Sequence, residues 1–213
     1  MKPGKNSETA LEKRPTDGSK IAFSKMKIIS APESLGSDAN QSKSVPAVPV
    51  ALATQDIRRN RHAIIEGGLS VESLLGDIIS FYFFGEVHPR KEIFELMIVR
   101  ANWCSYAEKV KLIKVIIENE NLMEIEEKER FENELAQVSK WRDAFTHGSI
   151  SVDVTEENMG DISLSYFESK LIKELITDAL LTEIENTITE AFNKSLWVYS
   201  YLKKRQDSPV FSY

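Results

Sequence analysis

The stretch Val138-Ser139-Lys140-Trp141-Arg142-Asp143-Ala144-Phe145-Thr146-His147-Gly148-Ser149 brings an arginine, a neighbouring carboxylate and a histidine close together in the chain. A histidine titrates near neutral pH and can act as a general acid or base. An arginine keeps its positive charge and binds phosphate through a forked set of N–H donors. No other stretch of the sequence has an arginine with a carboxylate directly beside it and a histidine five residues after it, so Arg142, Asp143 and His147 are the candidate catalytic residues.

The spacing of Arg142 and His147 constrains the local structure. Five residues along an ideal helix turn through about 500°, or roughly 140° around the axis, so the two side chains would not share a face. They converge only if the helix ends between them or if two chains meet. Threonine is a mediocre helix former and glycine often follows a helix end, so Phe145-Thr146 before Gly148 predicts such an ending.

Apolar periodicity around this stretch predicts a mainly helical chain. Residues recurring every seven positions from Ile57 to Ile78 indicate an amphipathic first helix, in which Gly67-Gly68 and Gly76 require either a close helix neighbour or a kink. The capping box Ser105-Tyr106-Ala107-Glu108 predicts the start of the third helix. The predicted helices span Thr54–Phe84, Pro89 to about Trp103, Ser105 to the turn at Asn119–Leu122, roughly Ile125–Phe145, and Thr177 or Asp178 to about Lys204.

Between the motif and the last helix the apolar pattern changes to alternation, which is typical of strands. Ile150–Val154 and Ile162–Tyr166 alternate around a turn at Glu156–Gly160, and Leu171–Ile176 is a candidate third strand. The predicted fold is therefore an antiparallel four- to five-helix bundle with a small β-hairpin or meander inserted before the last helix. On that last helix, we expect the core face to carry Leu181, Ile184, Ile188, Phe192, Leu196 and Tyr199.

Residues 1–53 differ in composition from the rest of the chain. They hold five of the seven prolines and carry 8 Lys+Arg against 5 Asp+Glu, a net charge of +3, whereas residues 54–213 carry 19 against 28, a net charge of −9. This predicts a flexible, disordered tail at 1–53, a helical domain at 54–205 and a frayed C-terminus at 206–213. The total charge of −6 argues against a protein that coats nucleic acid, but leaves room for an enzyme that touches a few phosphates.

Cysteine usage and hydropathy bear on location. The single cysteine, Cys104, follows Trp103 in an apolar context, which favours structural burial and a reducing, cytoplasmic location. We expect no transmembrane helix, because no apolar run reaches about 18 residues. The polar stretch Met1–Lys20 predicts no signal peptide. Three well-separated histidines and the lack of a carboxylate pair at ligand spacing predict no metal site.

Arg142 and His147 together resemble the Arg-x4-6-His motif of the HEPN superfamily, with four residues between them. Asp143 matches the polar residue, usually asparagine, that commonly follows the arginine. HEPN domains are helical bundles with the motif late in a helix, so the order of predicted elements across residues 54–205 is also similar. The His147-Gly148 pair, followed by a hairpin and a final amphipathic helix, adds to the resemblance.

The resemblance implies a metal-independent endoribonuclease that needs no cofactor. His147 would take the proton from a ribose 2′-hydroxyl, whose oxygen attacks the adjacent phosphate to give a 2′,3′-cyclic phosphate and a free 5′-hydroxyl. Arg142 would stabilise charge on the phosphorane-like transition state, and Asp143 would orient Arg142 or His147. Family members usually pair through their motif helices, which implies RNA and a second copy of the chain as partners. A toxin or antiviral defence effector of this kind would also meet an inhibitory partner protein.

Two departures from the family leave a second function open. Toxins paired with nucleotidyltransferase antitoxins carry a tyrosine two residues after the histidine, where this chain has Ser149. Asp143 also places negative charge beside the expected phosphate. A HEPN-like bundle that no longer cleaves would serve as a binding or dimerisation module. Basic residues around His147 would favour catalysis, whereas an apolar or acidic surface would favour the module.

Other charged residues have simpler interpretations. Taken without the resemblance, Arg142 and Asp143 would be a surface ion pair, and His147 would cap a helix C-terminus. The basic stretch Arg58–His62 is expected to be a solvated face that could hold RNA phosphates. Glu66 is a candidate to face the bundle interior near the motif. Lys203-Lys204-Arg205 would complement the dipole of the last helix.

Overall fold

A computed structural model describes residues 47–101, 104–152 and 161–206, and this part of the chain is mainly helical. Its elements are α1 (Ala47–Phe84), α2 (Lys91–Phe94), a π-helical turn η1 (Glu95–Val99), α3 (Tyr106–Glu120), α4 (Ile125–His147), β1 (Ser149–Val152), β2 (Ile162–Phe167), β3 (Leu171–Leu175) and α5 (Asp178–Gln206). None of the described helices is both long enough and apolar enough to cross a bilayer.

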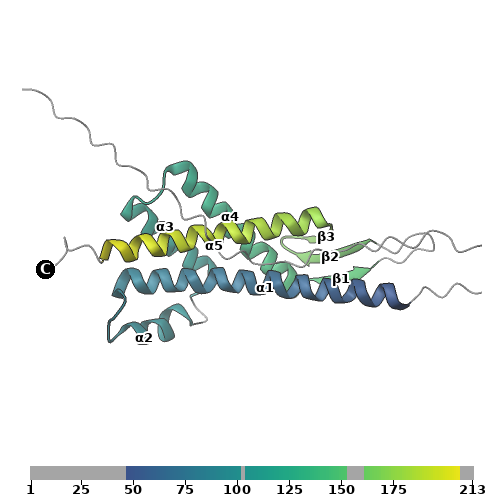
Figure 1. Cartoon of the computed structure of the whole chain (residues 1–213), viewed down its shortest axis with the longest axis horizontal. Helices are drawn as coiled ribbons and strands as arrows, with labels where there is room; N and C mark the ends of the chain where they lie inside the picture. The colour runs from purple at the N-terminus through teal and green to yellow at the C-terminus, as the bar shows by residue number, and fades with distance from the viewer. Residues whose placement is uncertain (1–46, 102–103, 153–160, 207–213) are drawn as a thin grey trace, which may run out of the picture.

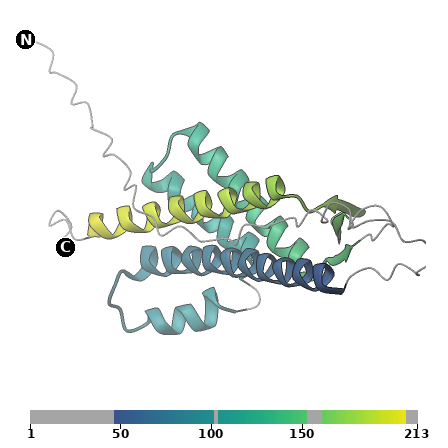
Figure 2. The same cartoon turned by 45° about the vertical axis from the view of Figure 1, so that its right-hand side comes forward.

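α1 is the helix around which the others pack. It contacts α3, α4 and α5, and it lies beside α5 with the opposite chain direction (Figures 1 and 2). The seven-residue repeat predicted for α1 is confirmed, because Ile57, Ile64, Val71 and Ile78 are all buried. α4 ends, and α1 begins, at the end of the molecule that carries the small sheet (Figure 1).

α1 begins earlier than predicted, at Ala47 instead of Thr54. Residues 47–53, which were assigned to a tail, are therefore helical. The rest of the predicted tail and the end of the chain after Gln206 lie outside the described residues, as does the turn predicted at Glu156–Gly160.

Glycines in α1 mark the two places where a neighbour approaches closely, as predicted. A Cβ on Gly68 would lie 3.0 Å from Cβ of Arg142 on α4. A Cβ on Gly76 would lie 2.8 Å from Cγ1 of Val99 on η1. Glycine lowers the stability of a helix interior, and here close packing with α4 and η1 offsets that loss.

The second predicted helix is shorter and less regular than expected. α2 begins at Lys91, after Pro89, and passes into the π-helical turn η1, which ends at Val99. Only Val99 of this segment is buried, while Ile93 and Met97 are more than half exposed. The apolar residues between Ile93 and Val99 do not lie on a single face of a helix, so this segment buries no continuous apolar face.

α4 continues unbroken through His147, so the prediction that it ends between Arg142 and His147 is wrong. The N–H of Gly148 donates to the carbonyl of Ala144 (2.8 Å), which closes the last turn. That turn accommodates Thr146, whose hydroxyl donates to the carbonyl of Arg142 (2.7 Å). Gly148 then leaves the helix in an extended conformation (φ −75°, ψ 158°) that leads into β1.

The three strands form an antiparallel meander in the order β1-β2-β3, which confirms the predicted hairpin and third strand. The register pairs Ile150 with Leu164 and Phe167 with Leu171. Leu164 is fully buried, and a Cβ on Gly148 would lie 2.9 Å from its Cδ1. The sheet is thus packed directly against the end of α4.

α5 begins at the predicted cap, because the hydroxyl of Thr177 accepts from the N–H of Leu180 (3.1 Å). Its core face is only partly as predicted. Leu196 is 39% exposed, and Phe192 and Tyr199 are half-buried. The buried residues of α5 are Leu181, Ile184, Ile188, Ala191, Lys194, Ser195, Val198 and Leu202.

Candidate functional site

The motif lies where the C-terminal end of α4 meets the middle of α1. His147 is the last residue of α4 and is exposed. Nη2 of Arg61 donates to the carbonyl of Thr146 (2.9 Å), the residue before His147. This contact brings the basic stretch of α1 to the motif, and Arg58 and His62 of that stretch are exposed.

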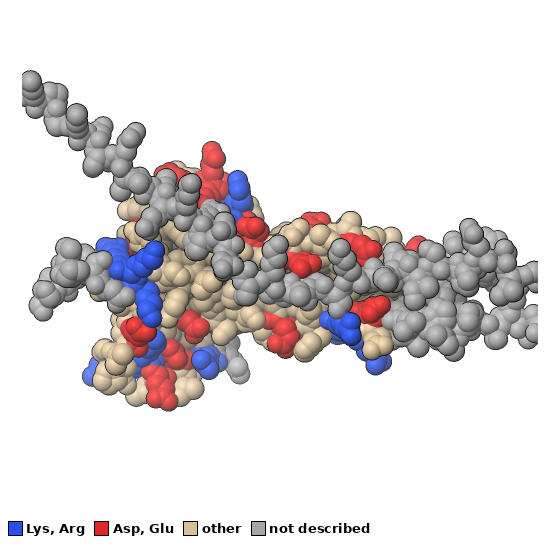
Figure 3. Space-filling view, in the orientation of Figure 1, with Lys and Arg blue, Asp and Glu red and all other residues tan. Residues whose placement is uncertain are grey.

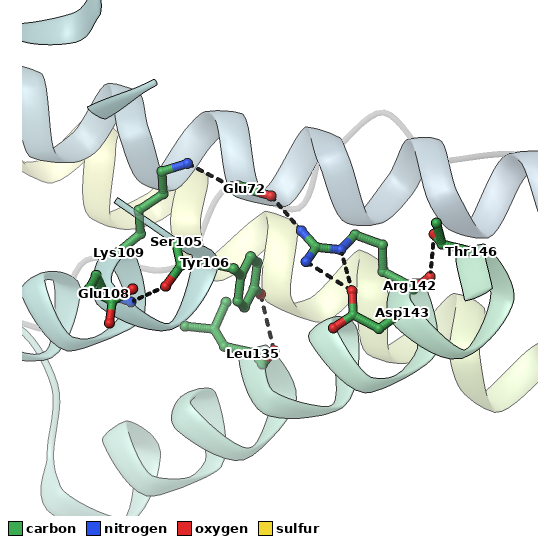
Figure 4. A network of polar contacts seen from close by, with 9 residues as sticks. All are labelled: Glu72, Ser105, Tyr106, Glu108, Lys109, Leu135, Arg142, Asp143 and Thr146. Atoms are coloured by element: carbon green, nitrogen blue, oxygen red, sulfur yellow. Dashed lines mark hydrogen bonds and ion pairs between the residues drawn. The ribbon is translucent and has the colours of Figure 1, made fainter. Parts of the chain in front are cut away.

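Arg142 is held by carboxylates from two elements (Figure 4). Its Nη1 forms an ion pair with Oε2 of Glu72 on α1. Its Nε and Nη2 donate to Oδ1 of Asp143 at 3.1 and 3.0 Å. These contacts take three of the five N–H donors of the guanidinium. The Arg142 side chain is 17% exposed, so it is neither in the core nor freely solvated.

Tyr106 forms the platform beneath the guanidinium. The Arg142 Cζ atom lies 5.1 Å from the centre of the Tyr106 ring, within the range of a cation–π contact. The Tyr106 hydroxyl donates to the carbonyl of Leu135 (3.0 Å). Burial raises the pKa of the Tyr106 phenol above its ordinary value, so the group remains a protonated donor.

Glu72 is the residue of this site that sequence reasoning missed. One of its oxygens binds Arg142, and the other accepts from Nζ of Lys109 on α3 at 2.7 Å (Figure 4). Glu72 therefore ties three helices together. A signal does exist in the sequence, because Glu72 lies midway between Gly68 and Gly76, four residues from each, on the close-packed stripe of α1. Glu66, the residue chosen as a candidate, is exposed.

A cleft of about 660 Å³ opens between α3, α4 and β2 beside the motif. His147 and Asp143 both line it. Much of its wall is apolar or aromatic and comes from Ala107, Val110, Ala136, Tyr166 and Phe167. Its charged side chains are balanced, with two lysines (Lys111 and Lys140) and two carboxylates (Asp143 and Glu168).

The structure does not join Arg142 to His147 directly. Within the described residues, no hydrogen bond or ion pair connects the two side chains, as expected for positions roughly 140° apart on one helix. Arg142 instead contacts Asp143 and Tyr106, and both of these line the cleft that His147 also lines. The arginine therefore lies behind one wall of the cleft and the histidine at its surface.

Two other predicted groups have structural roles. Lys203 donates to Oε1 of Glu86 (2.7 Å), and Arg205 forms an ion pair with Glu120. Basic side chains gather at this end of α5, far from the sheet (Figure 3).

Cys104 is buried, and burial raises the pKa of its thiol, as expected of a structural cysteine. In the part of the chain that the structure describes, no cluster of His, Cys, Asp and Glu could hold a metal ion.

Asn60 departs from the solvated face predicted for its stretch. It is 3% exposed, and its side-chain amide has no hydrogen-bond partner among the described residues. The basic stretch of α1 thus has an exposed side, which carries Arg58 and His62, and a buried one.

Comparison with known proteins yields no match, since no family model fits the chain and no curated protein or solved structure is significantly similar to it.

Proposed function

We propose that this protein is a metal-independent endoribonuclease of the HEPN type. The observation that carries the proposal is the cleft beside the end of α4, which His147 and Asp143 line and which Arg142 approaches through Asp143 and Tyr106. Metal-free phosphodiester cleavage is served by an acid–base group and a cation, and here an exposed imidazole lines the cleft while a fixed guanidinium lies behind its wall.

The reaction is an internal transesterification. His147 takes the proton of a ribose 2′-hydroxyl, and the 2′-oxygen bonds to the adjacent phosphorus. The bond from phosphorus to the 5′-oxygen of the next nucleotide breaks, and that oxygen takes up a proton from water. The products are a 2′,3′-cyclic phosphate and a 5′-hydroxyl. Arg142 stabilises the charge that builds on the phosphoryl oxygens, and Asp143 holds the guanidinium in place.

A homodimer through the motif helices completes the site. Because Arg142 and His147 lie on different sides of one unbroken α4, each would meet the complementary residue of a second copy across a shared cleft. Arg61, which donates to the carbonyl of Thr146, adds a cation at the end of the motif helix. As a toxin or antiviral defence effector in the cytoplasm, such an enzyme would be restrained by an inhibitory partner protein.

The test is incubation of the full chain with single-stranded RNA in the presence of a chelator. We expect cleavage of RNA but not of DNA, which lacks the 2′-hydroxyl. His147→Ala lowers the rate by about 10²–10⁴-fold, the usual contribution of a placed acid–base group. His88→Ala is the matched control, because His88 is an exposed histidine in the turn between α1 and α2, away from the cleft.

Two arginine variants test the second role. Arg142→Ala lowers the rate at least as much as His147→Ala. Arg142→Lys restores little activity, because an ammonium does not reproduce the forked contact with phosphate. Arg142→Lys keeps a cation beside Glu72, so it separates lost catalysis from lost folding when circular dichroism is measured alongside. Equal cleavage by wild type and His147→Ala would show that another site or a contaminant acts.

A second candidate function is a non-catalytic HEPN-like module for binding or dimerisation. Two observations favour it: the charge of Arg142 is met by Glu72 and Asp143, and the cleft is largely apolar with balanced charges. Under this alternative no form of the protein cleaves RNA, while a stable dimer persists in light scattering.

A further inference from the structure

The cleft beside His147 has a second part, which acid–base chemistry does not use. At the end of β2 it is lined by Tyr166 and Phe167, and on the helix side by Lys140 of α4 and Lys111 of α3. The His147 side of the cleft provides the proposed chemistry. The side of the cleft formed by Tyr166 and Phe167 of β2 has no role in that chemistry.

Phe167 is the most exposed aromatic ring among the described residues, at 74%. No other ring of the described chain packs against it. Tyr166 beside it is buried and fixed, since its hydroxyl donates to Oε2 of Glu174 (2.9 Å). Neighbouring residues of a strand point to opposite faces, so the Phe167 ring lies on the other side of β2 from Tyr166 and remains open. An open ring at the rim of a cleft is the kind of surface on which unpaired bases stack.

The cleft also carries two lysines, of which Lys140 lies beside aromatic rings. Nζ of Lys140 is 4.7 Å from the centre of the Trp141 ring and 5.8 Å from that of Tyr166. Its ion pair with Glu168 is long, at 3.6 Å, and exposed, so an anion can compete with it. The Lys111 side chain is 78% exposed, and its ion pair with Glu108 is also long, at 3.9 Å. Both ammonium groups can therefore meet backbone phosphates.

We propose that this part of the cleft binds an unpaired base of single-stranded RNA, which stacks on Phe167 while Lys140 and Lys111 contact the flanking phosphates. The proposal rests on the proposed function, because it places the base next to the phosphate that reacts at His147. A volume of about 660 Å³ lies within the range that protein pockets offer to small organic groups. Because every base has a π face, the site selects for unpaired strands and not for one sequence.

The experiment measures binding separately from cleavage. A fluorescein-labelled single-stranded RNA is titrated with the 213-residue chain carrying His147→Ala, which does not consume the probe, and anisotropy is followed. Adding Phe167→Ala weakens the affinity by roughly 5- to 150-fold, the range expected for loss of one stacked base. Phe167→Trp keeps the affinity. The same sequence as a duplex binds more weakly, because its bases are already paired.

Leu171→Ala is the matched control. Leu171 pairs with Phe167 across β2 and β3 and is equally exposed, at 72%, but it does not line the cleft. Leu171→Ala removes exposed apolar surface from the same pair of strands while every residue that lines the cleft stays in place, and it leaves RNA affinity unchanged. If Phe167→Ala and Leu171→Ala bind RNA alike, the proposal is overturned, as it is if duplex and single strand bind equally.

The outcomes also separate this proposal from the ribonuclease proposal. If wild type never cleaves but Phe167→Ala still loses affinity for RNA, the base site stands and the catalytic proposal fails. If wild type cleaves RNA and Phe167→Ala binds and cleaves as well as wild type does, the base site fails and catalysis stands. Dissociation of a dimer by Phe167→Ala with unchanged RNA affinity would assign the cleft to a second copy of the chain and overturn the proposal.

Discussion

At the scale of single residues, Arg142 shows how one side chain can belong to the architecture and to a site together. Its stem packs against Gly68, its ring contact is Tyr106, and its charge is matched by Glu72 and Asp143. If the proposed ribonuclease function holds, the guanidinium is already placed before RNA binds, which limits the ordering that a phosphate must induce. Within the described residues two of its five donors lack a partner and can bind an anion.

Glu72→Gln tests this placement. The amide keeps the size of the side chain but loses the charge that holds both Arg142 and Lys109. We expect the free energy of unfolding, measured by urea denaturation, to fall by about 1–3 kcal/mol, the usual effect of losing hydrogen bonds between charged groups that are partly buried. Glu66→Gln, an exposed change six residues earlier on the same helix, leaves it unchanged. A Glu72→Gln protein as stable as Glu66→Gln would show that the three-helix contact contributes nothing to stability.

At the scale of elements, the start of α5 is defined by a single hydroxyl group, while a second hydroxyl one turn later has no such effect. Thr177 accepts from the N–H of Leu180 at the start of α5, whereas Thr182 of the same helix donates to the carbonyl of Asp178 (2.7 Å). The first contact satisfies a backbone donor that the helix cannot satisfy itself. The second adds to a carbonyl that is already used within the helix.

Thr177→Ala should therefore destabilise the protein by about 1 kcal/mol, the usual cost of losing an N-cap side chain. Thr182→Ala removes the same atoms from the same helix and should change stability by less than about 0.5 kcal/mol, as surface substitutions usually do. Thermal unfolding of the two variants beside wild type measures both effects. Equal midpoints for Thr177→Ala and Thr182→Ala would contradict the capping role.

Sequence reasoning predicted the elements whose pattern is set by neighbouring residues. It was wrong where packing against a distant part of the chain decides which face is buried. The repeat of α1, the capping residues Ser105 and Thr177 and the alternation of the strands are local signals, and the structure bears them out. On α5 two faces were apolar enough to be the core. The face that is buried carries Lys194, because the Lys194 ammonium donates a hydrogen bond to Oε1 of Glu134 on α4 (2.5 Å). Leu196 lies on the other, exposed face.

The same reasoning applies to the candidate site. The position of the motif late in a helix followed from the sequence, because it needed only the local pattern around Arg142. Its surroundings did not, because Glu72 lies 70 residues from Arg142 in the chain and the cleft forms only when β2 packs on α4. Gly148 does lie just past the helix end as predicted, but its close packing with Leu164 depends on β2 and could not be read from the local sequence.

At the scale of the whole molecule, the proposed chemistry requires two copies of the chain to assemble. α4 is unbroken through His147, so a single chain keeps Arg142 behind the wall of the cleft and His147 at its surface. If catalysis needs both residues at one phosphate, a two-fold dimer with facing motif helices supplies them, one from each copy. A strictly monomeric mass at micromolar concentration would exclude this arrangement.

Mixing two inactive variants tests the arrangement directly. Chains carrying Arg142→Ala and chains carrying His147→Ala, unfolded together in equal amounts and refolded, pair at random, so about half of the dimers are mixed. In a shared site each mixed dimer has one cleft with both residues intact, which restores about a quarter of the wild-type rate of RNA cleavage. Sites contained within one chain restore nothing.

Wild type refolded with the double variant Arg142→Ala/His147→Ala is the control. Shared sites leave only the pure wild-type dimers active, so the rate per total protein falls to about a quarter of the wild-type rate. Separate sites would keep about half of it, because every wild-type chain keeps its own site. Restoration in the first mixture with a quarter in the second identifies a cleft built from two chains. No restoration, with mixed dimers verified by mass spectrometry, would place both residues of the reaction in one chain.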